Sequence, residues 1–499
     1  TIAAHAALLA LAADRPVKLV YERPEDMAAT TKRHPARIIH RTGVDAEGRL
    51  LAQDIEIRLD GGAYVTLSPV VLSRACIHAA GPYACDHVRI RGEAVLTNRV
   101  PYGAFRGFGN PQACFGFERH MDAIAERLEL DPIEVRRKNL IRDGQTTATG
   151  QVIEDGADRV AVLDRAVALG RVAERRETHA AFNATHADRR RGVGVVTYHH
   201  GAGFTGAGEV HLDSRVHAAG LPDGRVEVRA ASTEMGQGTI TVFTQLAADR
   251  LGLPAGDIVI ATPDTHRVPD SGPTVASRTA MIVGHLVERA CDDLRRRVGL
   301  TSGARGSIVR EAIRAWHEEH DREAVVGVGR YEAPPGIEWD ETTYRGSAYG
   351  TFCWAAHVAE VEVDLRTFGV RVLDYVAVQE VGKVLNEVLA RGQIQGGVVQ
   401  GIGWALFEDC IDRDGRMGNP ELTNYIIPTS GDVPPIRVDF LEVPYPHGAQ
   451  GSKGLGEFPL NGPPPALASA VAAALDVQPT AIPMTPERLM ELALAGTPA

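Results

Sequence analysis

Glu457 is the residue whose neighbours best equip it for chemistry, because it ends the glycine-rich stretch GSKGLGE (451–457). Glycine adopts left-handed backbone angles at little cost and lets a bulky ligand approach the main chain. Prolines 463–465 follow, and they predict the start of a helix because a helix tolerates proline in its first turn. A carboxylate on such a turn is suited to act as a general base beside an anionic cofactor. The alternative is a solvated loop glutamate.

Three further segments could bind such a cofactor. In STEMGQG (232–238), Gln237 would present its amide to an oxo group or phosphate at a helix N-terminus, although an ordinary tight turn is the alternative. In TVASRT (274–279), hydroxyls, backbone N–H groups and Arg278 could clamp a phosphate, or simply cap a helix. The glycines of GQIQGG (392–397) each cost a helix about 1 kcal/mol. They therefore indicate close helix packing or close approach of a ligand.

A fourth segment, PYGAFRGFGNPQ (101–112), places two phenylalanines and Arg106 among glycines. Exposed phenylalanines are unfavourable unless they stack on a partner. An arginine fork suits an acidic or oxo ligand. Together these loops predict a large anionic cofactor that backbone groups and amides hold, with one carboxylate beside it.

The histidines and cysteines offer no obvious metal site. Residues 317–320 (HEEH) lack HExxH spacing and are expected on a solvated helix face. His199 and His200 alternate across an expected strand, so they cannot both face one ion. The 6 cysteines are far apart, which argues against an iron–sulfur cluster or structural zinc in this chain. We expect all of them to be reduced core thiols of a cytoplasmic protein.

The bulk properties exclude some partners. With 499 residues the chain is too long for one core, so roughly two to four domains are expected. A net charge of -11 gives no general attraction for nucleic acid. No apolar run reaches membrane-spanning length. We therefore expect neither nucleic acid nor a membrane as a partner.

The expected elements form a mixed α+β and α/β fold. Residues 1–155 predict one α+β domain, 156–190 a helical connector, and 191–499 a second domain, with a division into two subdomains left open. The expected strands are 17–22, 37–41, 51–60, 94–97, 225–231, 257–261, 355–364, 370–380 and 436–443. The expected helices are 1–13, 117–128, one from 132, 239–251, 279–297, 389–408 and one after 465.

One formal dinucleotide-binding motif is rejected on its context. GAGFTG (201–206) matches GxGxxG after a strand, but that fingerprint requires a helix next. Residues 209–230 instead predict a β-hairpin around Asp223-Gly224. A nicotinamide-dependent function is therefore set aside.

Five motifs, in order, resemble the molybdenum-binding subunit of the xanthine dehydrogenase family of molybdenum hydroxylases. They are AFRGFGNPQ, TEMGQG, VASRT, GQIQGGVVQG and GSKGLGE, and the resemblance covers nearly the whole chain. It implies two elongated molybdenum-cofactor-binding domains with the cofactor between them. It also implies that a pterin dithiolene, and no protein ligand, holds the molybdenum. In this family a glutamate accepts the proton of an oxygen nucleophile that attacks an electron-poor carbon next to nitrogen.

The resemblance also implies roles, residue by residue. Glu457 is expected to be the base, Phe108 and Phe204 to stack on the substrate, and Arg74 to orient it where purine-oxidising members place an arginine. A surface arginine is the alternative for Arg74. The expected cofactor-binding residues are Phe105, Arg106, Gly236, Gln237, Gly238, Ala276, Ser277, Arg278, Thr279, Gln393, Lys453 and Gly454.

Further expectations concern cofactors and partners. Family members carry a glycine- and phenylalanine-rich loop before the equivalent of Thr1, so we expect a separate upstream chain or a truncation. The 2Fe-2S and FAD centres are expected on partner chains, and the pterin as molybdopterin cytosine dinucleotide. The expected substrate is a purine or other N-heterocycle. An aldehyde, an aromatic acid or thioester, and a non-catalytic scaffold stay open, whereas carbon monoxide is set aside because residues 103–109 lack the cysteine of such relatives.

Overall fold

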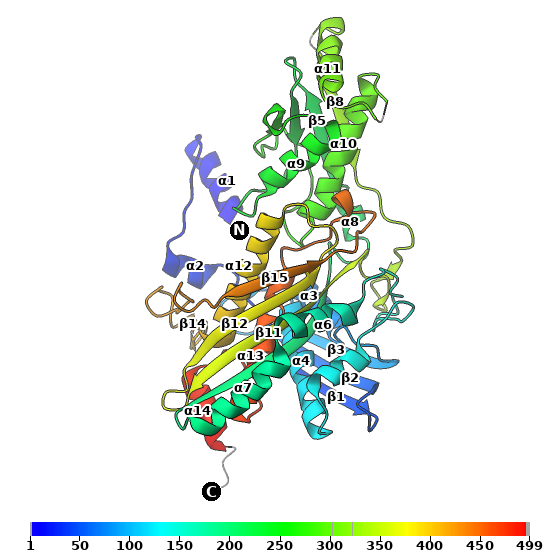
Figure 1. Ribbon diagram of the computed structural model, residues 1–499. Coiled ribbons are helices and arrows are strands. Elements are labelled where there is room, and N and C mark those ends of the chain that lie inside the picture. The colour runs from blue at the N-terminus through cyan, green and yellow to red at the C-terminus, as the bar shows by residue number, and fades with distance from the viewer. Residues whose placement is uncertain (1, 302, 322, 496–499) are drawn as a thin grey trace.

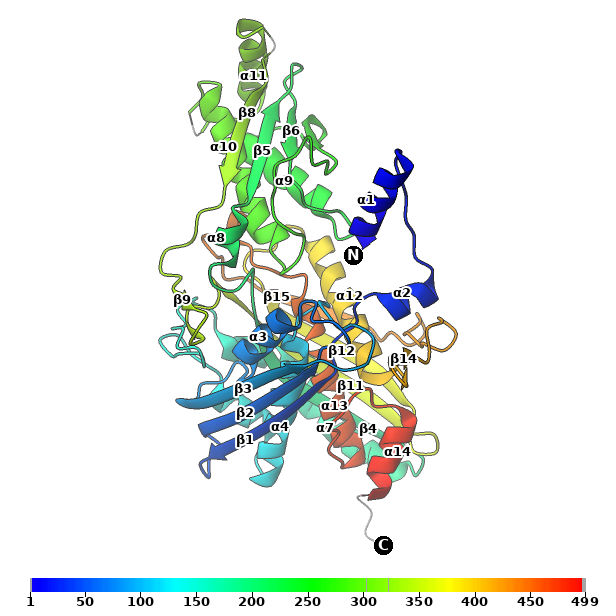
Figure 2. The same ribbon diagram turned by 180° about the vertical axis from the view of Figure 1, so that it is seen from behind.

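Three β-sheets with helices on their faces organise the chain. The computed structural model describes residues 2–301, 303–321 and 323–495. In these ranges there are one three-stranded and two four-stranded sheets, besides two short two-stranded ones. Figures 1 and 2 show one four-stranded sheet in the middle, the three-stranded sheet beside it, and the other four-stranded sheet in a lobe at the top.

The three-stranded sheet carries a helix that the sequence analysis does not predict. Strands β1 (Ala36–Val44) and β2 (Leu50–Asp60) form an antiparallel pair, and β3 (His87–Val95) is parallel to β2. Helix α3 (Ser68–His78) makes the crossover between β2 and β3. Alternate β2 residues, Ile55, Ile57 and Leu59, are buried against α3 because side chains of a strand alternate between its faces. This packing positions Arg74 on α3.

The central sheet has the strand order β15-β12-β11-β4. Strands β4 (Arg189–Gly201), β11 (Phe352–Asp364) and β12 (Val370–Glu380) are antiparallel, and β15 (Ile436–Leu441) runs parallel to β12. The sheet is covered on both faces, which explains why β4 is buried over most of its length.

The two faces of the central sheet meet different helices. On one face, Val195 and Val358 pack with α6 (Arg159–Leu169), beside which α7 (Val172–Thr185) lies. On the other face, Ala359 packs with α12 (Glu387–Leu406) and α13 (Pro463–Leu475). An added Cβ at Gly194 would lie 2.2 Å from the Ala466 carbonyl oxygen of α13, so glycine allows this close approach. The expected connector 156–190 therefore covers the sheet as two helices.

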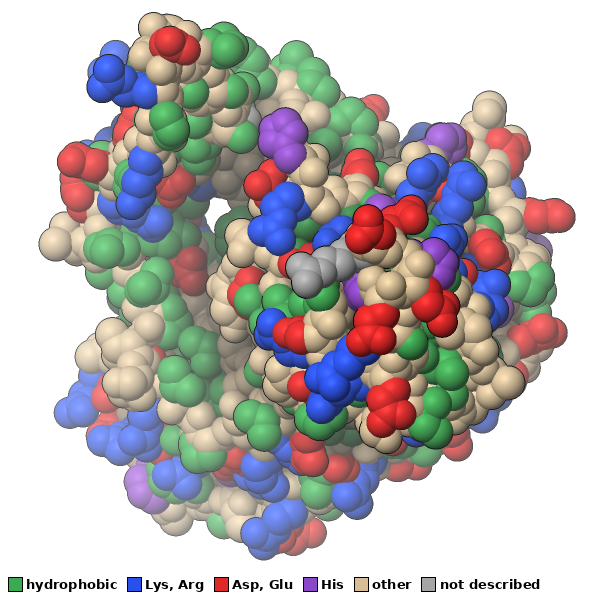
Figure 3. Space-filling view, turned by 90° about the horizontal axis from the view of Figure 1, so that it is seen from above, with side chains coloured by type: hydrophobic (Ala, Val, Ile, Leu, Met, Phe, Trp, Pro, Cys, Tyr) green, Lys and Arg blue, Asp and Glu red, His purple; other side chains and the backbone are tan. Residues whose placement is uncertain are grey.

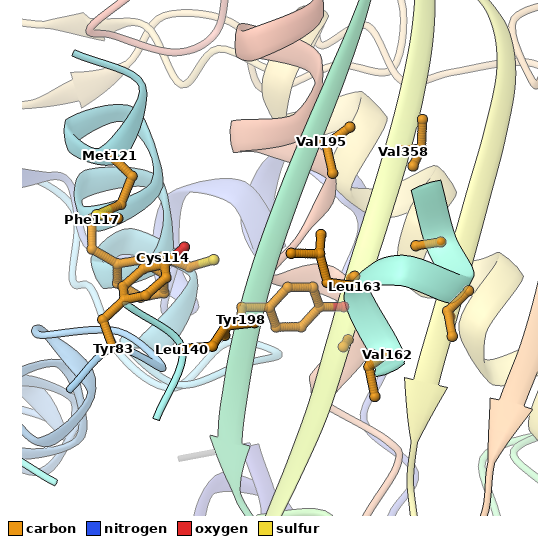
Figure 4. Close-up of a cluster of buried hydrophobic side chains, with 14 of the residues drawn as sticks. Tyr83, Cys114, Phe117, Met121, Leu140, Val162, Leu163, Val195, Tyr198 and Val358 are labelled. Carbon is orange, nitrogen blue, oxygen red and sulfur yellow. The ribbon is translucent and has the colours of Figure 1, made fainter. Parts of the chain in front are cut away.

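Helix α4 (Asn110–Arg127) and α5 (Pro132–Asn139) join the three-stranded sheet to the central one. Figure 4 shows Phe117 and Met121 of α4 on one side of β4 and Val162 and Leu163 of α6 on the other, within one apolar cluster. Helices α5 and α4 are joined by an ion pair, in which Arg136 Nε donates to Glu118 Oε2 over 2.8 Å with both side chains fully buried. The first 155 residues thus share a core with the central sheet, and the domain boundaries stay a prediction.

The upper lobe forms around the sheet β7-β6-β5-β8. Strands β5 and β6 form the hairpin that the sequence predicts after residue 209. Added Cβ atoms at Gly327 and Gly329 of β8 would lie 2.2 and 2.0 Å from carbonyl oxygens of α10, so these glycines let the helix pack tightly. The elements of the upper lobe are β5 (Arg215–Gly220), β6 (Val226–Arg229), β7 (Ile258–Ile260), β8 (Val325–Arg330), α9 (Thr239–Leu251), α10 (Gly284–Arg297) and α11 (Ser307–Glu319).

Several local expectations are wrong. Residues 17–22 form no strand in the described chain, and α2 (Arg23–Ala29) follows them. The five-residue helix α8 (Gly208–Leu212) follows GAGFTG, yet β4 is antiparallel to its neighbour β11, so the dinucleotide-binding unit is still absent from the described residues. The remaining elements are α1 (Ile2–Ala13), α14 (Pro486–Ala495), β9 (Trp339–Asp340), β10 (Arg345–Gly346), β13 (Asp412–Arg413) and β14 (Arg416–Met417).

The surface and the thiols complete the fold. No helix among the described residues is long and apolar enough to cross a membrane. Figure 3 shows basic and acidic side chains interspersed over the upper face, with a hollow between the mass on the left and the main body. Cys410 is exposed, so the expectation that all cysteines are core residues is wrong there. His317 is buried and its Nε2 lies 2.9 Å from the Gly220 carbonyl oxygen, so the expected solvated helix face is wrong for this residue, whereas residues 318–320 are exposed as expected.

Candidate active site

Glu457 lies where a loop leaves the central sheet and turns into α13. The loop is held at the end of β12, because Lys453 N donates to the Val381 carbonyl oxygen over 2.9 Å. Glu457 directly precedes a 3₁₀ turn (Phe458–Leu460) that leads into α13. Its side chain is 14% exposed. The carboxylate is therefore mostly buried, but a small part of its surface is accessible to solvent.

Three side chains from distant parts of the chain meet one oxygen of this carboxylate. Arg74 Nη1 of α3 lies 3.3 Å from Glu457 Oε2, and His200 Nε2 of β4 lies 3.4 Å from the same atom. Ser277 Oγ lies 3.5 Å from Oε2 and also accepts a hydrogen bond from Glu457 N over 2.8 Å. Burial alone would raise the pKa of Glu457, but His200 and Arg74 outweigh it and lower the pKa to about 2. The group is thus ionised at neutral pH.

Arg106 ties three of the glycine-rich loops together. Its Nε donates to the Gly456 carbonyl oxygen over 2.6 Å, and its Nη2 donates to the Gln393 carbonyl oxygen over 3.0 Å. Arg33 holds the backbone of Arg106, since Arg33 Nη2 donates to the Arg106 carbonyl oxygen over 2.6 Å. Segments 101–112, 392–397 and 451–457 therefore converge on one place.

The charge around Glu457 is positive in sum. The guanidinium of Arg33 lies between the rings of Phe105 and Trp404, 4.4 and 4.6 Å from their centroids. Burial lowers the pKa of Arg33 to about 9, so it stays charged at neutral pH. Arg33 also faces Glu408, so three arginines and two acids make up this group. Such an excess favours binding of an anionic group.

The glycines of helix α12 fall into two pairs with different surroundings. Added Cβ atoms at Gly397 and Gly401 would lie 2.7 Å from Pro459 and Pro463, so these two glycines serve packing. At Gly392 and Gly396, one turn apart, an added Cβ would meet no described atom within 4 Å. Gln393 lies between these two open positions. Packing therefore explains Gly397 and Gly401, whereas close approach of a ligand at Gly392 and Gly396 stays a prediction.

Segment 274–279 has a strained backbone beside the base. Ala276 and Ser277 both have a φ of 53°, which is unfavourable for residues other than glycine. A π-helical turn (Thr279–Val283) follows, a feature that is frequent at functional sites. An added Cβ at Gly454 would lie 2.6 Å from the Ser277 carbonyl oxygen, so this glycine permits the contact between the two loops.

Segment 232–238 lies against the start of α12. An added Cβ at Gly238 would lie 2.6 Å from Leu389 Cδ1, and Asn386 Nδ2 donates to Gln245 Oε1 over 3.1 Å. Leu389 is about one helical turn before Gln393. All four predicted cofactor loops and the loop of Glu457 are thus neighbours.

The donor set fits a cofactor held by backbone groups and arginines. The described ranges contain no group of three or more His, Cys, Asp and Glu side chains that could hold a metal ion. Around Glu457 there are three arginines and the open strip at Gly392 and Gly396. A molybdopterin, which is anionic and brings its own metal ligands, fits this arrangement.

Comparison with known proteins decides the family. Residues 1–140 and 165–434 each match a family model described as a molybdopterin cofactor-binding domain. A protein of Bacillus subtilis, named as a probable xanthine dehydrogenase subunit, is 32% identical over 98% of this chain. This chain belongs to the xanthine dehydrogenase family of molybdenum hydroxylases.

Solved structures of this family share the fold. Aldehyde oxidoreductase from Desulfovibrio gigas is 28% identical, with a TM-score of 0.88 over 98% of this chain and 52% of its own. Quinoline 2-oxidoreductase from Pseudomonas putida 86 is also 28% identical, with a TM-score of 0.87 over 98% of this chain and 65% of its own. The chain spans 66% of the Bacillus subtilis relative. The molybdenum hydroxylase chain described here thus corresponds to part of each of these proteins.

Two residues that the family motifs assign to the cofactor have buried structural partners. Arg278 is fully buried, and each of its side-chain nitrogens donates, chiefly to Glu209 of α8 at 2.8–3.0 Å. Lys453 Nζ donates to Glu380 Oε2 over 2.7 Å, with both side chains 1% exposed. These internal partners do not support cofactor contacts by the two side chains, and their assignment to the cofactor stays a prediction.

Gln237 also bonds within its own loop. Its Nε2 donates to the Thr233 carbonyl oxygen over 2.7 Å and to Thr239 Oγ1 over 2.8 Å. Glu234 accepts hydrogen bonds from the backbone N–H groups of Gly236, Gly238 and Ile240, which occupies the N-terminus of α9. An anion at that helix end is therefore not supported. The contacts of Gly236, Gln237 and Gly238 with a cofactor stay predictions.

The expected substrate residues have distinct settings. Arg74 is 4% exposed, so the surface alternative is wrong, and its Nη2 donates to the Gly203 carbonyl oxygen over 2.6 Å. Phe108 has a φ of 51° and packs partly buried against the core around α3. Phe204 is half-buried and lines a narrow cavity of about 60 Å³ with Met281 and Tyr331. Their roles toward a substrate stay predictions.

Two residues of the site are not found by sequence reasoning. Arg33 is one, because an isolated arginine carries no local signal. His200 is the other, since its spacing from His199 was weighed only for a metal site. Its ring points to Glu457, whereas His199 stacks on Trp354 with ring centroids 5.5 Å apart, so the two histidines do face opposite ways. The sequence signal that could have found His200 is the pair of polar residues 199–200 at the end of an otherwise apolar strand.

Proposed function

We propose that this chain is the catalytic, molybdenum-cofactor-binding part of a xanthine dehydrogenase-like hydroxylase. It would hydroxylate a carbon next to nitrogen in a purine or another N-heterocycle, with water as the oxygen source. The observation that carries the proposal is one ionised carboxylate, 14% exposed, at the place where five motif loops converge.

Each part of the site would have a physical task. When bound, the molybdopterin, with a cytosine dinucleotide in our proposal, supplies the redox centre that takes two electrons from the substrate. Gln393, Arg106, Phe105, the backbone of Ala276–Thr279 and the glycines of α12 would hold it. Glu457 would accept the proton of the attacking oxygen, because it is ionised at neutral pH and an anionic group bound close by would raise its pKa.

The substrate class rests on the relatives and on the residues beside the base. Relatives named for xanthine and quinoline support an N-heterocycle. Phe108 and Phe204 could stack on such a flat ring. A relative named for aldehydes keeps that class as the second candidate. Comparing turnover of a purine, quinoline and an aldehyde by the same preparation tests the assignment.

A partner chain would complete the protein. Helix α1 has no buried residue in the described structure, and its Leu8 and Leu11 are 65% and 80% exposed. Residues 17–22, which have strand-like composition, pair with no described strand. Apolar surface of this kind marks an interaction site. We infer that a separate chain with the remaining molybdenum-domain portion covers it, and that iron–sulfur and FAD subunits accept the electrons in a cytoplasmic complex.

Substitution of the base tests the proposal. Glu457→Gln keeps the size of the side chain but removes the proton acceptor, so turnover by the loaded complex should fall about 10²-fold or more. The control is Glu442→Gln, an exposed carboxylate that accepts from Val384 N over 2.8 Å and has no other side-chain hydrogen bond among the described residues, and it should leave turnover unchanged.

Molybdenum content separates the outcomes. If Glu457→Gln retains molybdenum and loses turnover, the base assignment stands. Near-normal turnover would remove Glu457 as the base. A well-expressed complex without molybdenum would favour a non-catalytic scaffold that keeps the fold.

A further inference from the structure

Ser277 contacts the base through its side chain. It is half-buried, and its Oγ lies 3.5 Å from Glu457 Oε2. The same Oγ lies 2.8 Å from Glu457 N. The hydroxyl makes no other hydrogen bond among the described residues. The family resemblance assigns Ser277 to the cofactor, but both of these contacts are made with Glu457.

The chemistry of the three groups fixes the direction of both hydrogen bonds. An amide N–H can only donate, so Ser277 Oγ accepts from Glu457 N. The hydroxyl keeps one proton to donate, and an ionised carboxylate can only accept. Glu457 Oε2 is the acceptor for that proton. One hydroxyl therefore links the main chain of Glu457 to its own carboxylate.

This link restricts a side chain that would otherwise rotate about several bonds. Ordering a glutamate costs rotamer freedom, so a base with a fixed position needs groups that hold it. Arg74 Nη1 and His200 Nε2 also contact Oε2, at 3.3 and 3.4 Å. Of the three groups at Oε2, Ser277 alone also contacts the Glu457 main chain. Glu457 Oε1 has no hydrogen-bond partner in the described part of the chain.

The backbone around Ser277 is held in its strained conformation from both sides. Ala276 and Ser277 both have a φ of 53°. The Ala276 carbonyl oxygen accepts from Gly203 N over 3.0 Å, and the fully buried Arg278 donates to Glu209. Strain of this kind persists only where the surroundings impose it, and it is concentrated at functional sites. Here the strained turn places one hydroxyl on the base.

We propose that Ser277 is a positioning residue for Glu457: its hydroxyl joins the main chain of Glu457 to Oε2, so that the side chain keeps one rotamer and Oε1 stays free to accept the proton. This inference rests on the proposed role of Glu457 as the base. The Ser277 hydroxyl takes no part in the proton transfer, and it is not required to hold the pterin.

The other titratable groups that face Glu457 stay unchanged in the test. They are Arg74 on α3, His200 on β4, Arg33, Arg106 and Tyr349. Ser277 carries no charge, so its substitution changes the hydrogen bonding of Glu457 and not the charge around it. Because the hydroxyl donates to the ionised form, its loss should raise the pKa of Glu457. The ionised base is then lost at a higher pH.

Two substitutions separate the hydroxyl from the backbone strain. Ser277→Ala removes the hydroxyl and keeps the strained φ, whereas Ser277→Gly removes the hydroxyl and relieves the strain. Both variants of the loaded complex should lose about tenfold or more in kcat, with KM changed by about twofold or less. The acidic limb of kcat/KM should move up by about 0.5 to 1 pH unit in both. Molybdenum and pterin contents should stay at the parent level.

The control is Ser469→Ala on α13, which removes a buried hydroxyl that donates to Asp122 of α4. It should keep the parent profile. A parent-like profile in either Ser277 variant would overturn the inference, because the hydroxyl would then be dispensable. Loss of pterin from both Ser277 variants, or a shifted limb in Ser469→Ala, would overturn it as well.

Amide hydrogen exchange of the loaded complex, followed by mass spectrometry, gives a readout that does not depend on turnover. Because Glu457 N donates to the Ser277 hydroxyl, its exchange should be about fivefold or more faster in Ser277→Ala, and unchanged in Ser469→Ala. Equal exchange in the parent and Ser277→Ala would overturn the inference while leaving Glu457 as the base. Near-normal turnover of Glu457→Gln would instead remove the proposed function, whatever the Ser277 variants do.

Discussion

At the scale of single residues, the site depends on an acid that is buried and yet ionised. Burial penalises the charge of Glu457, and a buried carboxylate without cations would be protonated near neutral pH. Here Arg74 and His200 outweigh burial. A low pKa makes the group a weak base in the free chain. An anionic group bound close by would raise this pKa toward the useful range.

Arg74 gives a prediction at this scale. Arg74 donates to Glu457 and to the Gly203 carbonyl oxygen, so Arg74→Ala removes a positive charge that contacts the base. The pKa of Glu457 should then rise, and since the ionised form is lost as the pH falls through the pKa, activity should fall first at acidic pH. We expect turnover of both a purine and an aldehyde to decrease.

The substrate dependence of Arg74→Ala measures its second role. A loss that is greater for the purine by about tenfold or more would show a direct contact with the substrate. An equal loss on both substrates would show that Arg74 acts through Glu457 and makes no contact with the substrate. Unchanged profiles on both would contradict its place beside Glu457.

At the scale of elements, α12 separates packing from ligand approach. Gly397→Ala places a Cβ 2.7 Å from Pro459 and should destabilise the chain by about 1–3 kcal/mol. Gly396→Ala meets no described atom within 4 Å and should stabilise the bare chain by up to about 1 kcal/mol. Because the open strip is where we place the cofactor, Gly396→Ala should nevertheless lower the pterin content.

Thermal unfolding and pterin analysis of the purified variants check this pair. Full pterin content in Gly396→Ala would show that the strip faces solvent or another partner. A stable Gly397→Ala would contradict the packing of α12 on the segment before α13.

The sequence identified the loops but not their ion pairs. Glycine and hydroxyl patterns are local, so segments 232–238, 274–279, 392–397 and 451–457 were predicted correctly as neighbours of one site. The partners of Arg278 and Lys453 are Glu209 and Glu380, which are 69 and 73 residues away. Such pairs follow from tertiary packing, which a local pattern does not contain.

The predictions of secondary structure also divide into local patterns, which were right, and elements that depend on tertiary packing. Long periodic segments, such as helix 239–251 and strand 370–380, were predicted with the bounds that the structure has. Residues 17–22 have strand propensity but no described partner strand, and propensity alone does not form a sheet. Helix α3 was missed because its valines favour strands, and its packing on β2 and β3 is not contained in a local pattern.

At the scale of the whole molecule, an apolar helix stands apart from the body. Figure 1 shows α1 in blue beside the upper lobe, joined to the rest by an extended segment. Leu8→Asp with Leu11→Asp should leave the isolated chain folded, because exposed positions change stability by about 0.5 kcal/mol or less. The same variant should fail to co-purify with its partner chain, since a charge in an apolar interface is costly.

Affinity purification of the co-expressed subunits measures this effect. The control is Ile308→Asp on α11, a residue that is 54% exposed in the upper lobe, and it should co-purify normally. Normal co-purification of the α1 variant would contradict the interface. Failure of both variants would point to a general loss of folding.

The most direct test of the account is an experimental structure of the loaded complex. The central claim is that the molybdopterin lies where Arg106, Gln393, the Ala276–Thr279 backbone and the Glu457 loop converge. We predict density for the pterin along the open face of α12, with the molybdenum next to Glu457 Oε1. A pterin bound elsewhere, with Glu457 facing only protein or solvent, would contradict the account.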